Sequence, residues 1–284
     1  MNIATSLDCG GRVLELSRTA IMGILNITPD SFSDGGIFLS HDAAVARAIT
    51  MVEEGADLID VGGESTRPGA QAVPVQEELD RVIPVIEAIA RAVPVPISID
   101  TSKPDVMRAA VAAGAGFIND VRSLREPGAV ETAAALQVPV CLMHMQGEPR
   151  SMQHHPVYSD VAVEVRDFLQ ERIDACITAS IPRQRIVLDP GFGFGKTVEH
   201  NLDLLRRLGV LRTFGVPILA GLSRKSMIGN LFGLPVTQRM HASVALALIA
   251  VQNGATLLRV HDVRATREAI RTLEAVYSGV RKET

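Results

Sequence analysis

The sequence predicts an α/β protein, a (β/α)8 TIM barrel that forms a single domain over residues 1–284, with its barrel core at about 20–278. Short runs rich in valine, isoleucine and leucine recur, and each precedes a longer segment with apolar residues at helical spacing. Eight such pairs follow one another without a linker or low-complexity tract. A chain of 284 residues suits one barrel. An open dinucleotide-binding sheet is disfavoured because no GxGxxG follows the first strand.

The eight expected strands are short, β-rich runs bounded by turn residues. In chain order they are 20–26, 57–62, 95–101, 116–121, 139–144, 185–189, 217–222 and 256–261. Helical patterns lie between them, and the clearest are 42–55, 75–92, 103–115 and 241–255. Several end in Gly-Ala just before the next strand, where glycine supplies the left-handed turn that stops a helix.

Composition narrows the function classes. The 28 basic and 32 acidic residues give a net charge of −4 without a lysine-arginine block, which disfavours nucleic acid as a partner. Cys9, Cys141 and Cys176 lack CxxC spacing, so we expect thiols without a bridge in a reducing compartment. The N-terminus has no apolar signal region and the longest apolar stretch, near 244–251, is too short to span a bilayer. We expect a cytoplasmic protein with no membrane partner.

Polar residues concentrate where the expected strands end, which is the catalytic face of a barrel. One polar strand end usually caps a helix or bonds a loop, but all eight together favour a site. The residues in chain order are Asn26, Asp60, Asp100, Asn119, Asp120, His144 and Asp189, followed by Ser223, Arg224 and Lys225 after the seventh strand and Arg259 and His261 on the eighth.

The run DPGFGFGKT, residues 189–197, resembles a nucleotide phosphate loop but does not fit one. A Walker A loop needs GxxxxGK[ST], and its first glycine would fall on Pro190, which has no N–H to donate. Gly191 and Gly193 give a loop of the wrong length. The stretch therefore needs another explanation.

The last two strand ends suit an anion. Barrel enzymes often bind phosphate after strands 7 and 8. Arg259 and His261 lie two apart and so project from the same face, at the end of an otherwise apolar strand. A solvated loop remains a reasonable interpretation for Arg224. Two or three charge-assisted bonds, each about 1.5–3 kcal/mol, could anchor a diphosphate.

Carboxylates and an amide suit a flat heterocycle. Asp100 and Asp189 would approach one another across the barrel mouth, with Asn119 nearby. A carboxylate only accepts and an amide both donates and accepts, which matches adjacent ring N–H and NH2 donors. Asp60 and Asp120 could instead hold helix starts. No HxH or HExxH occurs, and His154-His155 have no partner spacing, so stable transition-metal binding is not expected.

Two loops, TPDSFSDGG after the first strand and GGESTRPGA after the second, are long and rich in Gly, Pro, Ser and Asp. This composition suits lids that order over substrate.

Eight motifs together resemble the bacterial dihydropteroate synthase family, in its order, from about residue 21 to 263. They are GILNITPDSFSDGG, DVGGESTRPG, SIDTSKP, INDVRS, LMHMQGEP, LDPGFGFGK, GLSRKSMIG and RVHDV. The resemblance implies a barrel transferase of folate biosynthesis, joining 6-hydroxymethyl-7,8-dihydropterin diphosphate to 4-aminobenzoate with release of pyrophosphate. It also implies Mg2+ and a homodimer, and the family is the target of sulfonamides.

The resemblance also implies site roles. The pterin would contact Asp100, Asn119, Asp189 and Lys225, with Met143 and Phe194 packing around the ring. The diphosphate would meet Asn26, Arg67, Arg259 and His261, with Asn26 and Asp60 near the magnesium. The aminobenzoate pocket would use Phe32, Thr66, Pro68, Ser223 and Lys225. The reaction would be SN1-like, with Asp100, Asp189, Lys225 and Arg259 as the catalytic group.

Two alternatives share the pterin-holding acids. One is a methyltetrahydrofolate-type pterin-binding methyltransferase domain, and the other is a non-catalytic pterin-binding protein. The TPDSFSDGG, STRPG and RVH motifs disfavour both, because a carrier needs no diphosphate site.

Overall fold

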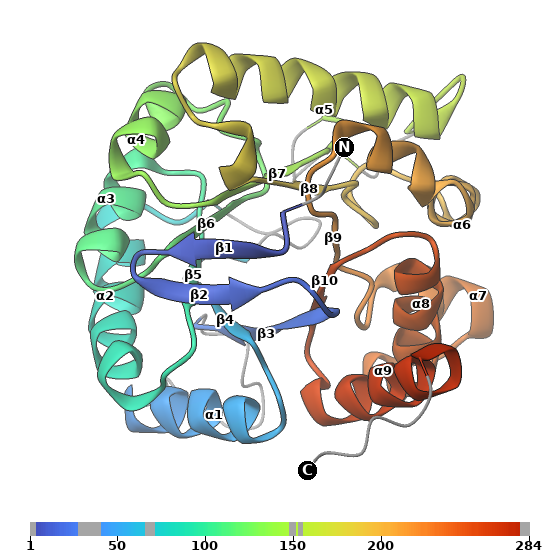
Figure 1. The fold of residues 1–284 in the computed structure, drawn as a ribbon, viewed down its shortest axis with the longest axis horizontal. Coiled ribbons are helices and arrows are strands. Elements are labelled where there is room, and N and C mark those ends of the chain that lie inside the picture. The colour runs from blue at the N-terminus through green and yellow to red at the C-terminus, as the bar shows by residue number, and fades with distance from the viewer. Residues whose placement is uncertain (1–3, 28–40, 66–71, 148–151, 153–155, 279–284) are drawn as a thin grey trace.

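A computed structural model describes residues 4–27, 41–65, 72–147, 152 and 156–278. Eight parallel strands form the barrel in the order β8-β7-β6-β5-β4-β3-β10-β9 (Figure 1). A parallel bridge between Leu188 and Ile218 joins the two ends of this order and closes the barrel. The strands are β3 Ala20–Asn26, β4 Leu58–Gly62, β5 Ile97–Asp100, β6 Phe117–Asp120, β7 Val140–Met143, β8 Ile186–Asp189, β9 Leu219–Ala220 and β10 Leu257–Val260.

Helices surround the strands as an outer ring (Figure 1). They are α1 His41–Glu53, α2 Val75–Ala92, α3 Pro104–Ala112, α4 Ala129–Leu136, α5 Val161–Thr178, α6 Val198–Arg206, α7 Ser226–Phe232, α8 Met240–Gln252 and α9 Val263–Ser278. The 3-10 turns are η2 Arg183–Arg185, η3 Leu208–Phe214 and η4 Val236–Gln238. The apolar faces of the α-helices pack on the outer faces of the strands in one continuous core. The predicted (β/α)8 barrel is confirmed.

The first strand matches its predicted range, and the others lie within theirs, shorter by one to four residues. The seventh differs most, because β9 keeps only two residues. The chain leaves the ladder at Gly221, where an added Cβ would lie 3.9 Å from both the Asp189 carboxylate and Cβ of Arg259. Backbone at this point therefore forms part of the barrel mouth.

A hairpin that the sequence reading did not foresee precedes the barrel. Strands β1 Ser6–Cys9 and β2 Arg12–Glu15 pair antiparallel around Gly10 and Gly11, which both have positive φ. The hairpin crosses one end of the barrel in Figure 1. Its inward side chains form one buried cluster with residues near the strand starts: Leu7, Cys9, Leu14, Leu16, Ala20, Met22, Leu58, Phe117, Cys141, Val187, Leu219 and Leu257. The hairpin thus closes the end opposite the strand carboxyl ends.

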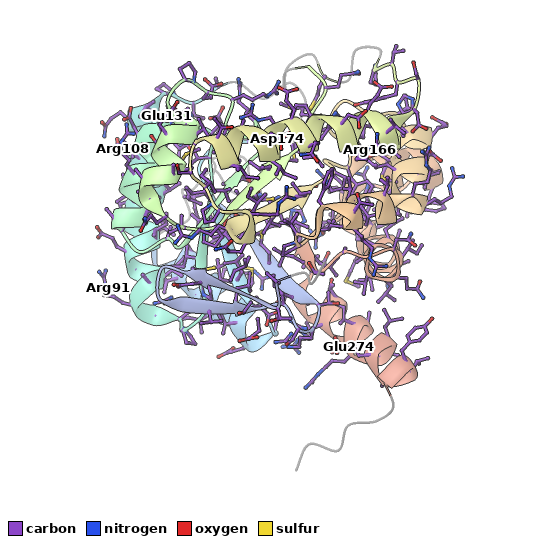
Figure 2. All side chains as sticks on the ribbon, turned by 45° about the horizontal axis from the view of Figure 1, so that its top comes forward. Arg91, Arg108, Glu131, Arg166, Asp174 and Glu274 are labelled. Atoms are coloured by element: carbon purple, nitrogen blue, oxygen red, sulfur yellow. The ribbon has the colours of Figure 1, made fainter. Side chains whose placement is uncertain are left out.

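The outer helix faces are charged. Figure 2 shows labelled side chains extending outward from five helices, namely Arg91, Arg108, Glu131, Arg166, Asp174 and Glu274. In the part of the chain that the structure covers, the helices are too short or too polar to cross a bilayer.

Candidate active site

An arginine joins three strands at the carboxyl end of the barrel. Arg259 of β10 donates from Nε to Asp60 Oδ2 of β4 at 2.6 Å and from Nη2 to Asp100 Oδ2 of β5 at 2.7 Å. Asn119 of β6 donates its amide to the same Asp60 oxygen at 3.2 Å. Parallel strands end at one edge, so residues distant in sequence meet here, as predicted. The guanidinium is shared by two carboxylates, which leaves excess negative charge.

Asp189 faces the same space from β8. Its Oδ1 accepts the N–H of Gly191 at 2.7 Å, which leaves Oδ2 directed to the mouth beside Gly221. An added Cβ on Gly221 would lie 3.9 Å from both Asp189 Oδ2 and Arg259 Cβ, and the Arg259 charge acts on the Asp189 carboxylate. We call the space at the barrel mouth between these residues the cup. Asp100, Asn119 and Asp189 form its acceptor side, and Arg259 forms its cationic side.

Burial controls the charge of these groups. Desolvation raises the pKa of Asp100, opposed by Arg259, and raises the pKa of Asp189, opposed by the Gly191 N–H and by Lys225. Desolvation lowers the pKa of Lys225 to about 8, despite the opposing charge of Asp189. Desolvation thus disfavours the charged forms of these groups, and such pKa shifts are common at functional sites.

An aromatic ring and a methionine border the acceptor side. Lys225 Nζ lies 4.1 Å from the ring centroid of Phe194, a cation–π distance. Met143 and Phe194 are nearly buried and belong to one small apolar cluster with Val121, Met145 and Met152. This cluster forms an apolar surface next to Lys225.

His261 lies beside Arg259 but is not a cation. Ser223 Oγ lies 2.9 Å from His261 Nδ1 and accepts the His261 backbone N–H at 3.1 Å. The donor in the Ser223–His261 bond depends on the histidine tautomer: with the ring proton on Nε2, the Ser223 hydroxyl donates to Nδ1. Burial, then Arg259, lowers the pKa of His261 to about 3. At neutral pH the ring of this residue is therefore neutral, which refines the cationic role expected from the sequence.

Two strand-end residues have structural partners. Arg224 pairs with Asp262, and its backbone N–H, at φ 56°, donates to Ser243 Oγ at 2.8 Å. Asp120 accepts the N–H groups of Arg122 at 2.8 Å and Leu124 at 2.7 Å and also bonds Ser102. Asp120 thus supports the turn after β6 rather than a helix start, which was the alternative interpretation for it.

Oxygen donors for a cation lie at one side of the cup. Asp60 is fully buried, and its Oδ1 has no hydrogen-bond partner among the described residues. Asn26 Oδ1 lies close to Gly62, 3.7 Å from the position of an added Cβ, as does Asp100 Oδ2. Carboxylate and amide oxygens suit Mg2+, which keeps several waters and adds phosphate oxygens. These residues fit magnesium, whereas no group of three His, Cys, Asp or Glu ligands occurs in the described ranges.

Part of the predicted site lies outside the described residues. Outside lie Phe32, Thr66, Arg67, Pro68 and His154-His155. The first expected lid also lies outside, as does the second except for residues 62–65. Glu64, at the base of the second loop, pairs with Lys103, which also pairs with buried Glu78.

Several residues at the site escaped the sequence reading. A cavity of about 300 Å³ lies beside the Asp189 loop, lined by Gly193, Lys196, Thr197, Ser226, Met227 and Asn230 among others. It borders the cup, since Gly193 packs against the Lys225 side chain. Ser226, at the start of α7, lines this cavity, whereas Ser223 lies against His261. The signal for Ser226 in the sequence was its position directly after Lys225, where a helix start is expected.

Three comparisons address this fold and site. The sequence profile described as "Pterin binding enzyme" matches residues 22–261. The dihydropteroate synthase of Escherichia coli K12 is 54% identical over 268 residues, 94% of this chain and 95% of the relative. A structure of Xanthomonas albilineans dihydropteroate synthase with 4-aminobenzoic acid is 56% identical, with a TM-score of 0.92 over 98% of this chain and 100% of that one. Another, with 7,8-dihydropteroate, is 53% identical, with a TM-score of 0.88 over 97% and 100%.

The barrel fold, with its charged residues at the strand carboxyl ends, defines an enzyme of the pterin-binding barrel class. This class is the transferase type of pterin-binding barrel. The profile match covers most of the chain, and full-length relatives agree with it. The chain belongs to the dihydropteroate synthase family of pterin binding enzymes.

Proposed function

We propose that the protein condenses 6-hydroxymethyl-7,8-dihydropterin diphosphate with 4-aminobenzoate to give 7,8-dihydropteroate and pyrophosphate. One observation carries the proposal. Asp189 and Arg259 open onto the same cup, on either side of Gly221. A substrate that carries a donor-rich ring and a diphosphate can therefore use both at once.

The ring would occupy the acceptor side. Asp189 Oδ2 and the carbonyl oxygen of Asn119 accept from the ring N–H and amino groups, since Asn119 donates its own amide to Asp60. Phe194, Met143 and the Lys225 stem cover the ring face. Asp100 Oδ1, which has no partner among the described residues, is a further acceptor.

The diphosphate would lie toward β10. Arg259 is already paired with Asp60 and Asp100, so its remaining guanidinium N–H groups and His261 Nε2–H are the donors available. Arg67 and Asn26 would complete the set. Asn26 and Asp60 would hold Mg2+, which would supply Lewis-acid stabilisation of the departing diphosphate.

The proposed chemistry is SN1-like. The bond between the pterin methylene carbon and the diphosphate oxygen breaks, and the electron pair leaves with pyrophosphate. Arg259 and His261 stabilise the charge that develops on the leaving oxygens. The uncharged arylamine nitrogen then attacks the methylene cation and loses a proton. The residues of the cup act by positioning and charge stabilisation, because the aniline nitrogen needs no general base to become nucleophilic.

The arylamine pocket would combine Phe32, Thr66 and Pro68 with Ser223 and Lys225. Ser226 extends this proposal, because it faces the cavity beside Gly193 whereas Ser223 is engaged with His261. Arylsulfonamides, which share the shape of 4-aminobenzoate, would compete here.

A homodimer and a cytoplasmic location complete the proposal. Exposed apolar residues on and around α7 and α8 support a dimer face, namely Leu231, Phe232, Val236, Met240 and Ile249. Three thiols without a bridge fit a reducing compartment.

Pyrophosphate release tests the proposed function. The purified protein is incubated with dihydropterin diphosphate, 4-aminobenzoate and Mg2+, and released pyrophosphate is measured with and without the arylamine. We expect release that depends on both substrates. Release that ignores the arylamine, or none at all, would refute the condensation.

A further inference from the structure

One buried lysine holds the loop between β8 and α6. Lys196 is 3% exposed, and its Nζ lies 2.8 Å from Gly191 O, 3.0 Å from Phe194 O and 2.9 Å from His144 Nδ1. An ammonium has three N–H donors, and all three have an acceptor here. The site of Lys196 is therefore built around its charge rather than around its aliphatic stem.

The loop itself turns sharply against β7. Gly191, Gly193 and Gly195 all have positive φ, at 69°, 79° and 58°. An added Cβ on Gly191 would lie 1.8 Å from His144 O, and one on Gly195 would lie 2.5 Å from Gln146 O. Glycines allow this path but do not hold it, because they also permit many others. The hydrogen bonds to the loop carbonyls select this conformation.

The residues that Lys196 holds are the ones that face the ring site. Gly191 accepts Lys196 through its carbonyl and donates its own N–H to Asp189 Oδ1 at 2.7 Å. Phe194 accepts Lys196 through its carbonyl and presents its ring to Lys225. Displacement of either peptide would move the Asp189 carboxylate or the Phe194 ring.

Burial of the ammonium is unfavourable by itself. Desolvation lowers the pKa of Lys196 to about 7, although the Asp189 charge opposes this. A methionine would fill the same volume without a buried charge. The cation at this position is thus explained by its three acceptors.

We propose that Lys196 is a positioning residue for the pterin: its ammonium fixes the Gly191 peptide and the Phe194 ring against the substrate. The inference rests on the proposed function, because it assumes that the pterin binds between Asp189 and Phe194. Lys196 does not itself reach the reacting atoms, since it is enclosed by the loop and His144.

The test is Lys196→Met, which keeps the chain length and removes the donors. Loss of charge-assisted bonds to the loop is expected to raise the Kd for 6-hydroxymethylpterin about tenfold or more, measured by calorimetry. Pyrophosphate, which would use Arg259 and His261, is expected to bind within about twofold of wild type. The KM for the pterin diphosphate should rise while kcat falls less. A general structural defect would lower both affinities together.

Tyr158→Phe is the matched control. Tyr158 Oη donates to Gly195 O of the same loop at 2.8 Å but contacts neither the Gly191 nor the Phe194 carbonyl. The affinity of this variant for the pterin should stay close to that of wild type, because the lost hydrogen bond is neutral and holds neither the Gly191 nor the Phe194 peptide. A cooperative thermal melt of each variant establishes that it is folded.

His144→Phe is the second variant, because it removes one acceptor and leaves both loop carbonyls to Lys196. It should weaken pterin binding selectively by about threefold. Unchanged pterin affinity in Lys196→Met, or in His144→Phe if Lys196→Met does not fold, would overturn the inference, as would equal losses for pterin and pyrophosphate. A wild-type protein that does not bind the pterin would instead refute the proposed function.

Discussion

Asp189 is the residue on which ring recognition depends. One of its oxygens is occupied by the Gly191 N–H, so the other is the acceptor available to a ligand. Its ionised form is opposed by desolvation, and a ligand with two adjacent donors would offset that cost. Binding of such a ring should therefore favour the ionised carboxylate.

The first prediction concerns Asp189→Asn. The amide would direct a donor at a ring donor, so the Kd for 6-hydroxymethylpterin should rise about 100-fold. Calorimetry measures this value, and Asp203→Asn on α6, whose carboxylate pairs with Arg207, is the control. Wild-type affinity in Asp189→Asn would reject the assigned role.

The second prediction concerns pH. Desolvation lowers the pKa of Lys225 to about 8, below that of the unfolded chain. Between these values the unfolded state binds the proton and the native state does not, so stability rises with pH from about 8 to 10 and is lower below that window. Because Lys225 is half-buried, we expect the change in unfolding free energy across this window to be on the order of 1–2 kcal/mol.

Denaturant unfolding of wild type and Lys225→Met at several pH values measures this contribution. Between about pH 8 and 10, the unfolding free energy of wild type should rise relative to that of Lys225→Met. A difference that does not vary with pH would show that Lys225 has an ordinary pKa in the native state.

Sequence patterns located most of the cup residues but not their partners. Asp100, Asn119, Asp189 and Arg259 were predictable because a polar residue at the end of a buried strand is conspicuous. The Ser223–His261 bond and the Lys196 contacts were not, because they join residues that only the folded backbone brings together. Their roles toward ligands stay predictions.

At the scale of elements, β10 carries the anion side of the cup. Its Arg259 joins β4 and β5 across the barrel, so the strand supplies both a structural ion pair and the proposed phosphate donors. Removing one partner of a buried ion pair typically lowers the unfolding free energy by about 3–5 kcal/mol. Substitution here should affect stability as well as binding.

The third prediction concerns Arg259→Ala. Loss of a charged donor should raise the Kd for the pterin diphosphate about 100-fold and that for the pterin alcohol less than about tenfold. Arg206→Ala, on an exposed side chain of α6, should change neither. Equal losses for the two ligands would place the phosphate site elsewhere.

The fourth prediction concerns the contact between the β1–β2 hairpin and the barrel. Gly116 precedes β6, and an added Cβ would lie 1.9 Å from Cys9 O. We therefore predict that Gly116→Ala displaces the hairpin and lowers the unfolding free energy by about 1–3 kcal/mol. Urea denaturation measures the loss. Gly209→Ala, whose added Cβ approaches nothing closer than 3.7 Å, should have a smaller effect, and equal stabilities would contradict the contact.

Element types were more predictable than element ends. The barrel strands follow from aliphatic runs and the helices from their periodicity, and these expectations are confirmed. β9 keeps only two residues, and Gly221, which follows it, lies beside Asp189 and Arg259. The hairpin was missed although its Gly10-Gly11 turn between alternating residues is a recognisable signal.

At the scale of the molecule, the two ends of the barrel have separate tasks. The hairpin and a buried apolar cluster close one end, and the charged cup occupies the other. Several desolvated charges gather at the functional end, although the Arg267–Asp57 pair near the strand starts is also largely buried, and a large apolar core offsets their cost. This division explains why one chain can hold several desolvated ions and still fold.

A crystal structure with the pterin diphosphate bound tests the shared cup most directly. The ring donors should lie within hydrogen-bond distance of Asp189 Oδ2, and the diphosphate oxygens should lie against Arg259 and His261 in the same molecule of ligand. A ring bound away from Asp189, or a diphosphate on a different surface from Arg259, would contradict the account.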